Sequence, residues 1–241
     1  MDGSDDQPRI VAIETSGRQG SVAVAAGDDV LGMTRFASDR QHAVALLPSI
    51  GRLCETVGWR PGQIDEVYVS AGPGSFTGCR IGVALARAMA QAVGVRLVRV
   101  PTVDVLARNA LDRPAPPKHL AVLLDAQRRQ AYMARFHLAK DAYRREDEVR
   151  MGDVKSLVAR LLRPCAALGE GIAYHRQVIE AAGLEILPES LWPARAENVL
   201  RVGRWLAGRG AYVAINQLLP IYVRIPEAEE RWQERHGKES S

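Results

Sequence analysis

The 241-residue sequence is poor in the residue types that define several protein classes. Its three cysteines, Cys54, Cys79 and Cys165, lie far apart, which argues against a disulfide framework and for reduced thiols. The five histidines are equally dispersed, so a zinc site built from neighbouring His and Cys is not expected. No uninterrupted apolar run reaches about 18 residues, which excludes a transmembrane helix. The first residues are acidic and form no secretory signal, so we expect a cytoplasmic protein.

Lysine is also scarce: arginine supplies 28 of the 32 basic residues. Such usage is typical of a GC-rich genome and also of nucleic-acid binding, and both interpretations stay open. Residues 1–113 carry 12 basic and 12 acidic side chains, so the whole net charge of +4 lies in residues 114–241. A surplus of this size is too small to predict phosphate binding by itself.

Hydrophobic residues make up 47% of the chain and charged residues 25%, which is typical of a soluble globular protein. The segment 113–118 holds three prolines, which cannot continue a helix or lie in a central strand. We therefore expect a hinge at 113–118 between lobes at 9–112 and 119–225, with a disordered start at 1–8 and a charged tail at 226–241.

The first lobe is predicted to begin with strands at 9–14, 21–26 and 30–36. Helices and strands then alternate, with Pro48 expected to kink or break the first helix. The expected elements are a helix at 41–57, a strand at 64–70, a loop at 72–78, a helix at 79–93, a strand at 95–100 and a helix from 102.

The second lobe is predicted to open as the first does. Residues 9–14 and 120–125 are apolar runs that end in an acid, and a polar turn and a second strand follow each of them. Setting Glu14 against Asp125 aligns both hairpins without a gap, at an offset of 111 residues. The repeated order predicts two related α/β lobes that meet at a cleft. An α/β domain with an appended α+β domain is the alternative.

The most distinctive local feature is the run AGPGSFTGCRIG at residues 71–82, which lies between an apolar strand and an Ala-rich helix. Glycines permit close backbone approach, and N–H groups at the start of a helix can receive an anion. The spacing matches neither GxGxxG nor GxxxxGK[ST], so a tight strand-to-helix connection is the alternative to a phosphate site. The candidate phosphate or nucleotide residues are Gly72, Gly74, Ser75, Thr77, Gly78 and Arg80.

Glu14 and Asp125, the acids that end the first strand of each lobe, form a second candidate site. Two carboxylates facing one cleft could hold a metal or position a water molecule. A strand-end acid that caps a turn is the alternative. None of Ser16, Ser21, Ser70 and Ser75 has a histidine nearby in the sequence, so no local catalytic triad is identified.

The helix after the glycine-rich run carries two rows of small residues. Gly82, Ala86 and Ala90 form one row with i, i+4 spacing, and Ala84, Ala88 and Ala92 form another. One row can pack on a sheet while the other allows a second helix to approach closely. The sequence does not decide which row faces outward, and a buried core helix is the alternative to a partner-binding helix.

Four segments of this chain resemble those of a known family. They are IVAIETS at 10–16, QHAVALLP at 41–48, AGPGSFTGCRIG at 71–82 and PIYVR at 220–224, and they are similar to the TsaB (YeaZ) family. The resemblance spans residues 9 to about 225 and is most specific at 71–82. It implies an α/β fold of two ribonuclease-H-like lobes from the actin/hexokinase/Hsp70 (ASKHA) superfamily.

Proteins of this family are partners of the catalytic subunit TsaD, and the difference from TsaD is informative. TsaD-like proteins carry an Asn-His-x-x-x-His pattern whose histidines hold a metal. Here the corresponding stretch is PTVDVL at 101–106, with Thr102 and Leu106 at the two histidine positions. Leucine cannot ligate a metal, and Asp104 does not restore a two-histidine site. The resemblance therefore implies no catalytic residues and no metal in this chain.

The function implied by the resemblance is that of a non-catalytic subunit that dimerises with a TsaD-like enzyme and activates it. The complex transfers a threonylcarbamoyl group from its adenylate to the adenosine next to the tRNA anticodon. A TsaE-like ATPase in the same assembly, a homodimer of the chain alone and contact with tRNA through the complex are further expectations. No cofactor is expected, although ATP or ADP could bind at the partner interface. The expected interface residues are His42, Leu46, Gly82, Leu85, Ala86, Met89 and Ala90.

Two other functions stay open at this point. An ATP-dependent phosphotransferase of the same superfamily would use the glycine-rich loop for phosphate and Glu14 or Asp125 for magnesium. A glycoprotease-like metallohydrolase is the other possibility, and the missing histidine pair argues against it.

Overall fold

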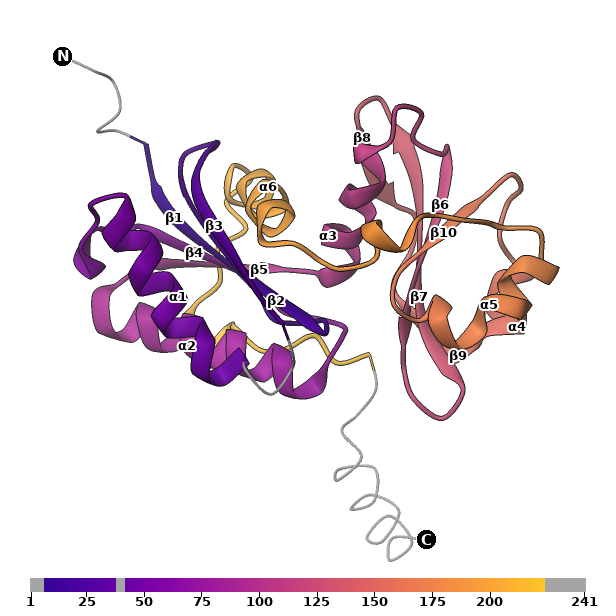
Figure 1. Cartoon of the computed structure of the whole chain (residues 1–241), viewed down its shortest axis with the longest axis horizontal. Helices are drawn as coiled ribbons and strands as arrows, with labels where there is room; N and C mark the ends of the chain where they lie inside the picture. The colour runs from indigo at the N-terminus through magenta and orange to yellow at the C-terminus, as the bar shows by residue number, and fades with distance from the viewer. Residues whose placement is uncertain (1–6, 38–41, 224–241) are drawn as a thin grey trace, which may run out of the picture.

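The computed structural model describes residues 7–37 and 42–223, which form two α/β lobes joined side by side (Figure 1). The expectations for residues 1–6 and for the tail at 226–241 lie outside these described ranges. Each lobe is built on its own sheet. No helix in the described ranges combines the length and the apolar character needed to cross a membrane.

The sheet of the first lobe has the strand order β3-β2-β1-β4-β5. The first three strands are antiparallel neighbours, and β4 and β5 continue the sheet in parallel with β1. Alternate residues point to opposite faces, so Val11 and Ile13 of β1 pack toward one side while Ile10 and Ala12 pack toward the other. The bounds are β1 Arg9–Glu14, β2 Gln19–Ala26, β3 Asp29–Ala37, β4 Glu66–Ser70 and β5 Arg96–Val100.

Helices cover both faces of this sheet. One face is covered by α1 (His42–Thr56) and α2 (Phe76–Val93). Helix α1 continues through Pro48 without a break, because its second half is held by the buried side chains of Ile50 and Cys54. Helix α2 begins three residues before the predicted start, since Ser75 caps it by accepting a hydrogen bond from the Gly78 N–H.

The second lobe repeats the sheet of the first. Its strand order is β8-β7-β6-β10-β11, which corresponds strand by strand to β3-β2-β1-β4-β5 of the first lobe. In both sheets the first three strands are antiparallel neighbours and the last two continue in parallel. This confirms the predicted duplication. An additional strand, β9, pairs with β7. The strand bounds are β6 His119–Asp125, β7 Gln130–Ala139, β8 Ala142–Arg145, β9 Arg150–Asp153, β10 Ala166–Leu168 and β11 Glu185–Ile186. The helices are α4 Val154–Val158 and α5 Ile172–Ala181.

The ungapped alignment of the two hairpins is wrong by one residue in the second strand. Glu14 pairs with Ser21 across β1 and β2, whereas Asp125 pairs with Ala131 across β6 and β7. At a constant offset the partner of Asp125 would be Tyr132. The second turn is therefore one residue shorter than the first.

The chain does not stay in the second lobe after β11. Helix α6 (Ala196–Ala207) returns to the first lobe and covers the face of its sheet opposite α1 and α2 (Figure 1). A Cβ on Gly203 would lie 2.3 Å from the Tyr68 ring, so glycine lets α6 approach β4 closely. The expected lobe at 119–225 is thus too long, because residues 196–223 pack with the first lobe or along its edge.

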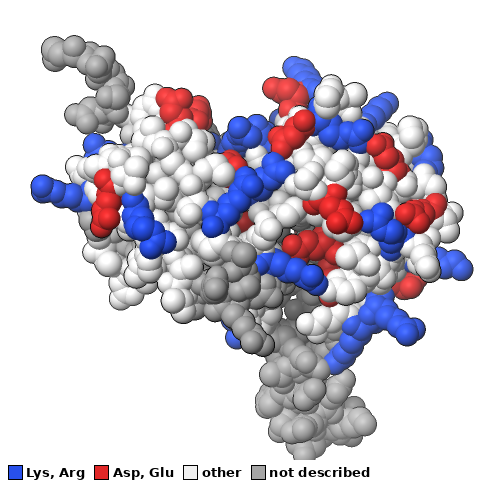
Figure 2. Space-filling view, viewed as in Figure 1, with Lys and Arg blue, Asp and Glu red and all other residues white. Residues whose placement is uncertain are grey.

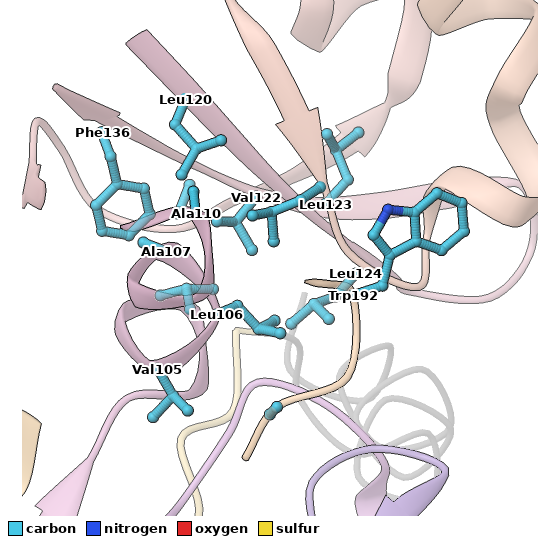
Figure 3. Packing of buried hydrophobic residues seen from close by; sticks show 14 of the residues in the cluster. Val105, Leu106, Ala107, Ala110, Leu120, Val122, Leu123, Leu124, Phe136 and Trp192 are labelled. Atoms are coloured by element: carbon cyan, nitrogen blue, oxygen red, sulfur yellow. The ribbon is translucent and has the colours of Figure 1, made fainter. Parts of the chain in front are cut away.

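Helix α3 (Thr102–Asn109) joins the two lobes through a shared apolar core. Figure 3 shows Leu106, Ala107 and Ala110 of this region facing Leu120 and Val122 of β6. Helix α3 also packs on α6, so the core runs from the first sheet through both helices to the second sheet. The lobes are consequently held together by buried side chains as well as by the chain connection.

Candidate functional site

A cavity of about 720 Å³ lies between the lobes and brings together most of the predicted site residues. The turn after β1, the glycine-rich loop, α3, the turn after β6 and the segment 220–223 all contribute to its wall. Five aromatic side chains line it: Phe76, Tyr132, Tyr174, Trp192 and Tyr222.

The glycine-rich loop lies at this cavity, but two of its glycines face away from it. Gly74, Ser75, Thr77 and Arg80 are lining residues, whereas Gly72 and Gly78 are not. A Cβ on Gly78 would lie 1.9 Å from the Thr15 carbonyl oxygen, far inside contact distance. The loop is thus pressed against the turn that follows β1, and the tight strand-to-helix connection accounts for its glycines.

Arg80 is held at the edge of the cavity by aromatic residues. Its Nε donates a hydrogen bond to the hydroxyl of Tyr222 at 3.0 Å, and its guanidinium lies 3.7 Å from the centroid of the Phe76 ring. The segment with Tyr222 is itself anchored, because the Ile221 N–H donates to the Ala71 carbonyl at 2.7 Å. The family resemblance includes this segment, but the sequence alone did not predict that it lies beside the glycine-rich loop.

The two candidate acids occupy different environments. Asp125 is exposed, lines the cavity and accepts a hydrogen bond from the Gln127 N–H at 3.0 Å. Glu14 is fully buried and is not among the lining residues. The expectation that both carboxylates face one cleft is therefore wrong for Glu14.

Hydroxyl groups surround the buried Glu14 carboxyl. Its Oε1 accepts hydrogen bonds from the backbone N–H and the hydroxyl of Ser16, each at 2.5 Å, while Oε2 has no partner among the described residues. Burial raises the pKa of Glu14, and the hydrogen bonds from Ser16 together with the nearby Ser70 hydroxyl oppose that rise. The hydrogen bonds from Ser16 tie the Glu14 carboxyl to the turn after β1.

Thr102 and Leu106, at the positions of the histidine pair in TsaD-like sequences, both line the cavity from one face of α3. The Thr102 hydroxyl shares a hydrogen bond with the Ser70 hydroxyl at 2.8 Å and accepts one from the Gly72 N–H at 3.1 Å. Leu106 is buried against β6. Within the described ranges no three His, Cys, Asp or Glu side chains come together as a metal site.

Asp104 lies between these two positions and is engaged elsewhere. One of its carboxylate oxygens is 3.8 Å from the Arg145 guanidinium of the second lobe. Burial raises the pKa of Asp104 to about 6, and the charge of Arg145 opposes the rise. Its role in the structure is a contact between α3 and β8.

The turn after β6 is a strained feature that sequence reasoning missed. Gln127, Arg128 and Arg129 have φ angles of 62°, 50° and 63°, a left-handed conformation that non-glycine residues rarely adopt. Gln127 and Arg128 line the cavity. No glycine in the sequence marks this turn, so the shorter second hairpin and its conformation could not be predicted.

The structure separates the expected partner-interface residues into buried and exposed positions. Leu46 is 1% exposed, Gly82 is buried against Thr15, and Ala86 and Ala90 belong to the core of the first lobe. These four residues pack inside the chain itself, so their assignment to a partner surface is wrong. Leu85 and Met89 are half-buried, and the side chain of His42 lies outside the described part.

Other side chains of α1 and α2 do face solvent. Val44 is 77% exposed and Leu47 is 58% exposed on α1, while Ala84 and Ala88 are exposed on α2. The two helices lie side by side on the same face of the sheet (Figure 1). The outward row of α2 is thus Ala84 and Ala88, and the row Gly82, Ala86 and Ala90 faces the sheet.

Two lobes with the same ribonuclease-H-like strand order, joined around a cavity, define a protein of the ASKHA superfamily. A family model described as TsaD, tRNA N6-adenosine threonylcarbamoyltransferase, matches residues 28–168, and the chain belongs to this family. Its nearly full-length relatives carry the name TsaB, and the segments quoted above identify the chain with that TsaB (YeaZ) branch.

The individual matches cover nearly the whole chain. The tRNA threonylcarbamoyladenosine biosynthesis protein TsaB of Bacillus subtilis is 26% identical over 235 residues, covering 93% of this chain and 98% of that protein. TsaB of Escherichia coli is 27% identical over 236 residues, with coverages of 96% and 100%. The solved structure of YeaZ from Pseudomonas aeruginosa superposes with a TM-score of 0.75 at 25% identity, covering 88% of this chain and 100% of that one.

Proposed function

We propose that this chain works in tRNA threonylcarbamoyladenosine biosynthesis as a non-catalytic subunit that dimerises with a TsaD-like transferase and activates it. The name of its full-length relatives supports the pathway. The observation that carries the non-catalytic role is the pair Thr102 and Leu106 at the cavity wall, where neither side chain can take the place of a histidine ligand.

The chemistry in this proposal belongs to the partner. The TsaD-like subunit transfers the threonylcarbamoyl group from its adenylate to N6 of the adenosine next to the anticodon, and AMP leaves. The contribution of this chain is a folded surface that holds the partner in its active arrangement. We expect its effect on the partner to appear in the rate of transfer, because the chain brings no reacting group of its own.

The exposed apolar side chains of α1 and α2 are the proposed partner surface. Val44 and Leu47 are three residues apart on α1 and project from the same face, and Ala84 and Ala88 are exposed on α2, which contacts α1. Small residues permit close helix approach, and a buried apolar surface contributes about 25 cal/mol per Å² before the costs of association. The same surface would support a homodimer when the partner is absent.

Two further components belong to the proposal. A TsaE-like ATPase joins the same assembly, and ATP or ADP binds at the interface with the partner rather than as a resident cofactor of this chain. The phosphotransferase alternative is less well supported, because Glu14 does not line the cavity and the loop glycines pack against the turn after β1.

Reconstitution of the tRNA modification tests the proposal. A purified TsaD-like subunit from the same source is assayed with threonylcarbamoyl-adenylate and tRNA, with and without this chain. We expect modification to depend on the chain and the chain alone to give none. Equal modification in both reactions would overturn the activating role, and turnover by the chain alone would overturn the non-catalytic one.

A further inference from the structure

An exposed tryptophan lies close to two arginines on the side of the molecule opposite α1 and α2. Trp205 of α6 is 47% exposed, and the guanidinium carbons of Arg144 and Arg209 lie 5.2 Å and 4.8 Å from its ring centroid. Arg144 comes from β8 of the second lobe, so this contact also crosses the boundary between the lobes. Both distances are within the range of a cation–π interaction.

Two further arginines extend this cluster. Arg201 lies one helical turn before Trp205 on α6, and Arg108 projects from α3, which packs on α6. Burial lowers the pKa of Arg108, and the charge of Arg201 lowers it further. Its Nε is buried and has no hydrogen-bond partner among the described residues. We call Arg108, Arg144, Arg201, Trp205 and Arg209 the arginine–tryptophan surface.

The carboxylates that border this surface are mostly paired with other arginines. Asp104 lies 3.8 Å from Arg145, Asp112 lies 2.7 Å from Arg195, and Asp28 lies 3.1 Å from Arg204. The charges of Asp112 and Asp141 both act on Arg108, although neither carboxylate forms an ion pair with it. Within the part of the chain that the structure describes, none of the cluster arginines forms an ion pair with a carboxylate.

The arginines of this surface are therefore not neutralised by direct ion pairs among the described residues. Figure 2 shows basic side chains gathering, with some acidic ones among them, over the region where Figure 1 places α6 and β8. The net charge of +4 lies in residues 114–241, which include three of the four arginines of the surface. Arg108 adds a further charge from the first lobe.

We propose that the arginine–tryptophan surface binds the phosphate backbone of the RNA on which the complex acts. A guanidinium stacked on an indole keeps its N–H edge available, and that edge matches two phosphate oxygens. The contacts to Trp205 also hold Arg144 and Arg209 in place, which lowers the conformational entropy lost on binding. The exposed part of the indole adds an apolar surface that an unpaired base can contact.

This inference rests on the proposed function and goes beyond it, since that proposal needs no contact between this chain and RNA. Arg201 lies within α6 and Arg209 lies in the turn that follows the helix. Together with Arg144 on the other lobe they present several separated cations rather than one point. An extended polyanion matches this arrangement better than a single carboxylate or a small phosphate ester.

The experiment measures the binding of fluorescein-labelled tRNA to the assembled complex of this chain with its TsaD-like partner, by anisotropy, over a series of salt concentrations. The test variant is Arg144→Gln combined with Arg209→Gln. The control is Lys155→Gln combined with Arg160→Gln, which removes the same charge from exposed positions of the second lobe. We expect the test variant to bind about tenfold more weakly at low salt and the control to bind as the wild type does.

The salt dependence gives a second readout. Each lost phosphate contact lowers the slope of log K against log salt by roughly 0.7 to 0.9, so the test variant is expected to show a smaller slope than the control. Trp205→Ala is expected to weaken binding several-fold and Trp205→Phe to restore most of it, because a phenyl ring still supports both guanidinium groups.

Equal affinity and equal slope in the test and control variants would overturn the inference. Unchanged RNA binding together with weaker binding of the TsaD-like partner would also overturn it, and would identify the surface as a protein contact. The reconstitution assay separates the two proposals. If modification needs the chain but the test variant behaves as the control does, the RNA contact alone fails; if modification does not need the chain, the proposed function fails.

Discussion

Asn198 of α6 donates a hydrogen bond from Nδ2 to Oδ1 of Asn109, at the end of α3, over 2.6 Å. Both residues are buried. Asn109 in turn donates to the carbonyl oxygens of Leu191 and Pro193 at 2.7 Å and 2.8 Å. The side chain of Asn109 therefore fixes the chain where it leaves the second lobe and turns back to the first.

Replacing Asn109 with alanine is expected to lower the free energy of unfolding by about 2–4 kcal/mol, because a buried carbonyl group, a half-buried one and the Asn198 amide each lose a partner. Urea unfolding measures the change. Asn216→Ala, at an exposed position, serves as the control and is expected to change stability by less than about 0.5 kcal/mol. Equal effects of the two substitutions would contradict the structural role of Asn109.

The tight packing of the glycine-rich loop leads to a second prediction. Gly78→Ala places a Cβ 1.9 Å from the Thr15 carbonyl oxygen, so the loop or the turn after β1 must shift. We expect a loss of about 1–3 kcal/mol in the free energy of unfolding. Gly51 lies in α1, and no atom lies within 4 Å of a Cβ added there. Gly51→Ala is therefore expected to stabilise the protein by up to about 1 kcal/mol. Thermal unfolding of both variants tests the contrast, and a harmless Gly78→Ala would contradict it.

Glu14→Gln is expected to change how stability depends on pH. The pKa of Glu14 is raised in the folded state, so the folded protein holds this proton more tightly than the unfolded chain. The wild type therefore loses stability as pH rises from the unfolded pKa, about 4.5, through the folded pKa, while the variant lacks this loss. The stability of the variant relative to the wild type should increase with pH over that interval.

Urea unfolding of the wild type and of Glu14→Gln between about pH 4 and pH 8 measures this difference. The glutamine carbonyl can still accept the hydrogen bonds from Ser16, so the turn is retained. A stability difference that stays constant with pH would show that Glu14 titrates normally in the folded protein.

The partner surface is tested by arginine substitutions at matched positions of α1 and α2. Leu47→Arg and Ala84→Arg introduce charge at exposed sites, and we expect at least tenfold weaker binding of a TsaD-like partner with normal stability. Ala86→Arg is a different experiment, because Ala86 is fully buried and the variant is expected to lose its fold. Isothermal titration with the partner, alongside circular dichroism, distinguishes the cases. Unchanged affinity in both exposed variants would place the interface elsewhere.

The features predicted correctly from the sequence are those that depend on neighbouring residues. Apolar runs that end in an acid identified β1 and β6, and their repeated order identified the duplication. The two small-residue rows of α2 were equally small, so periodicity could not decide that Ala86 faces the sheet and Ala84 faces solvent.

The features that were missed depend on contacts between distant segments. Glu14 is buried because Ser70, from another strand, and the turn after β1 enclose it. The return of α6 depends on a glycine at position 203 that fits the Tyr68 ring. The arginine–tryptophan surface combines residues from α3, β8 and α6, and no local pattern in the sequence joins them.

Reconstituted tRNA modification tests the central claim most directly. The initial rate at which a TsaD-like subunit transfers the threonylcarbamoyl group to tRNA is measured with the wild-type chain, with Ala84→Arg and with no chain added. The account predicts full activity only with the wild type, and little or none in the other two reactions. The same rate in all three reactions would contradict it.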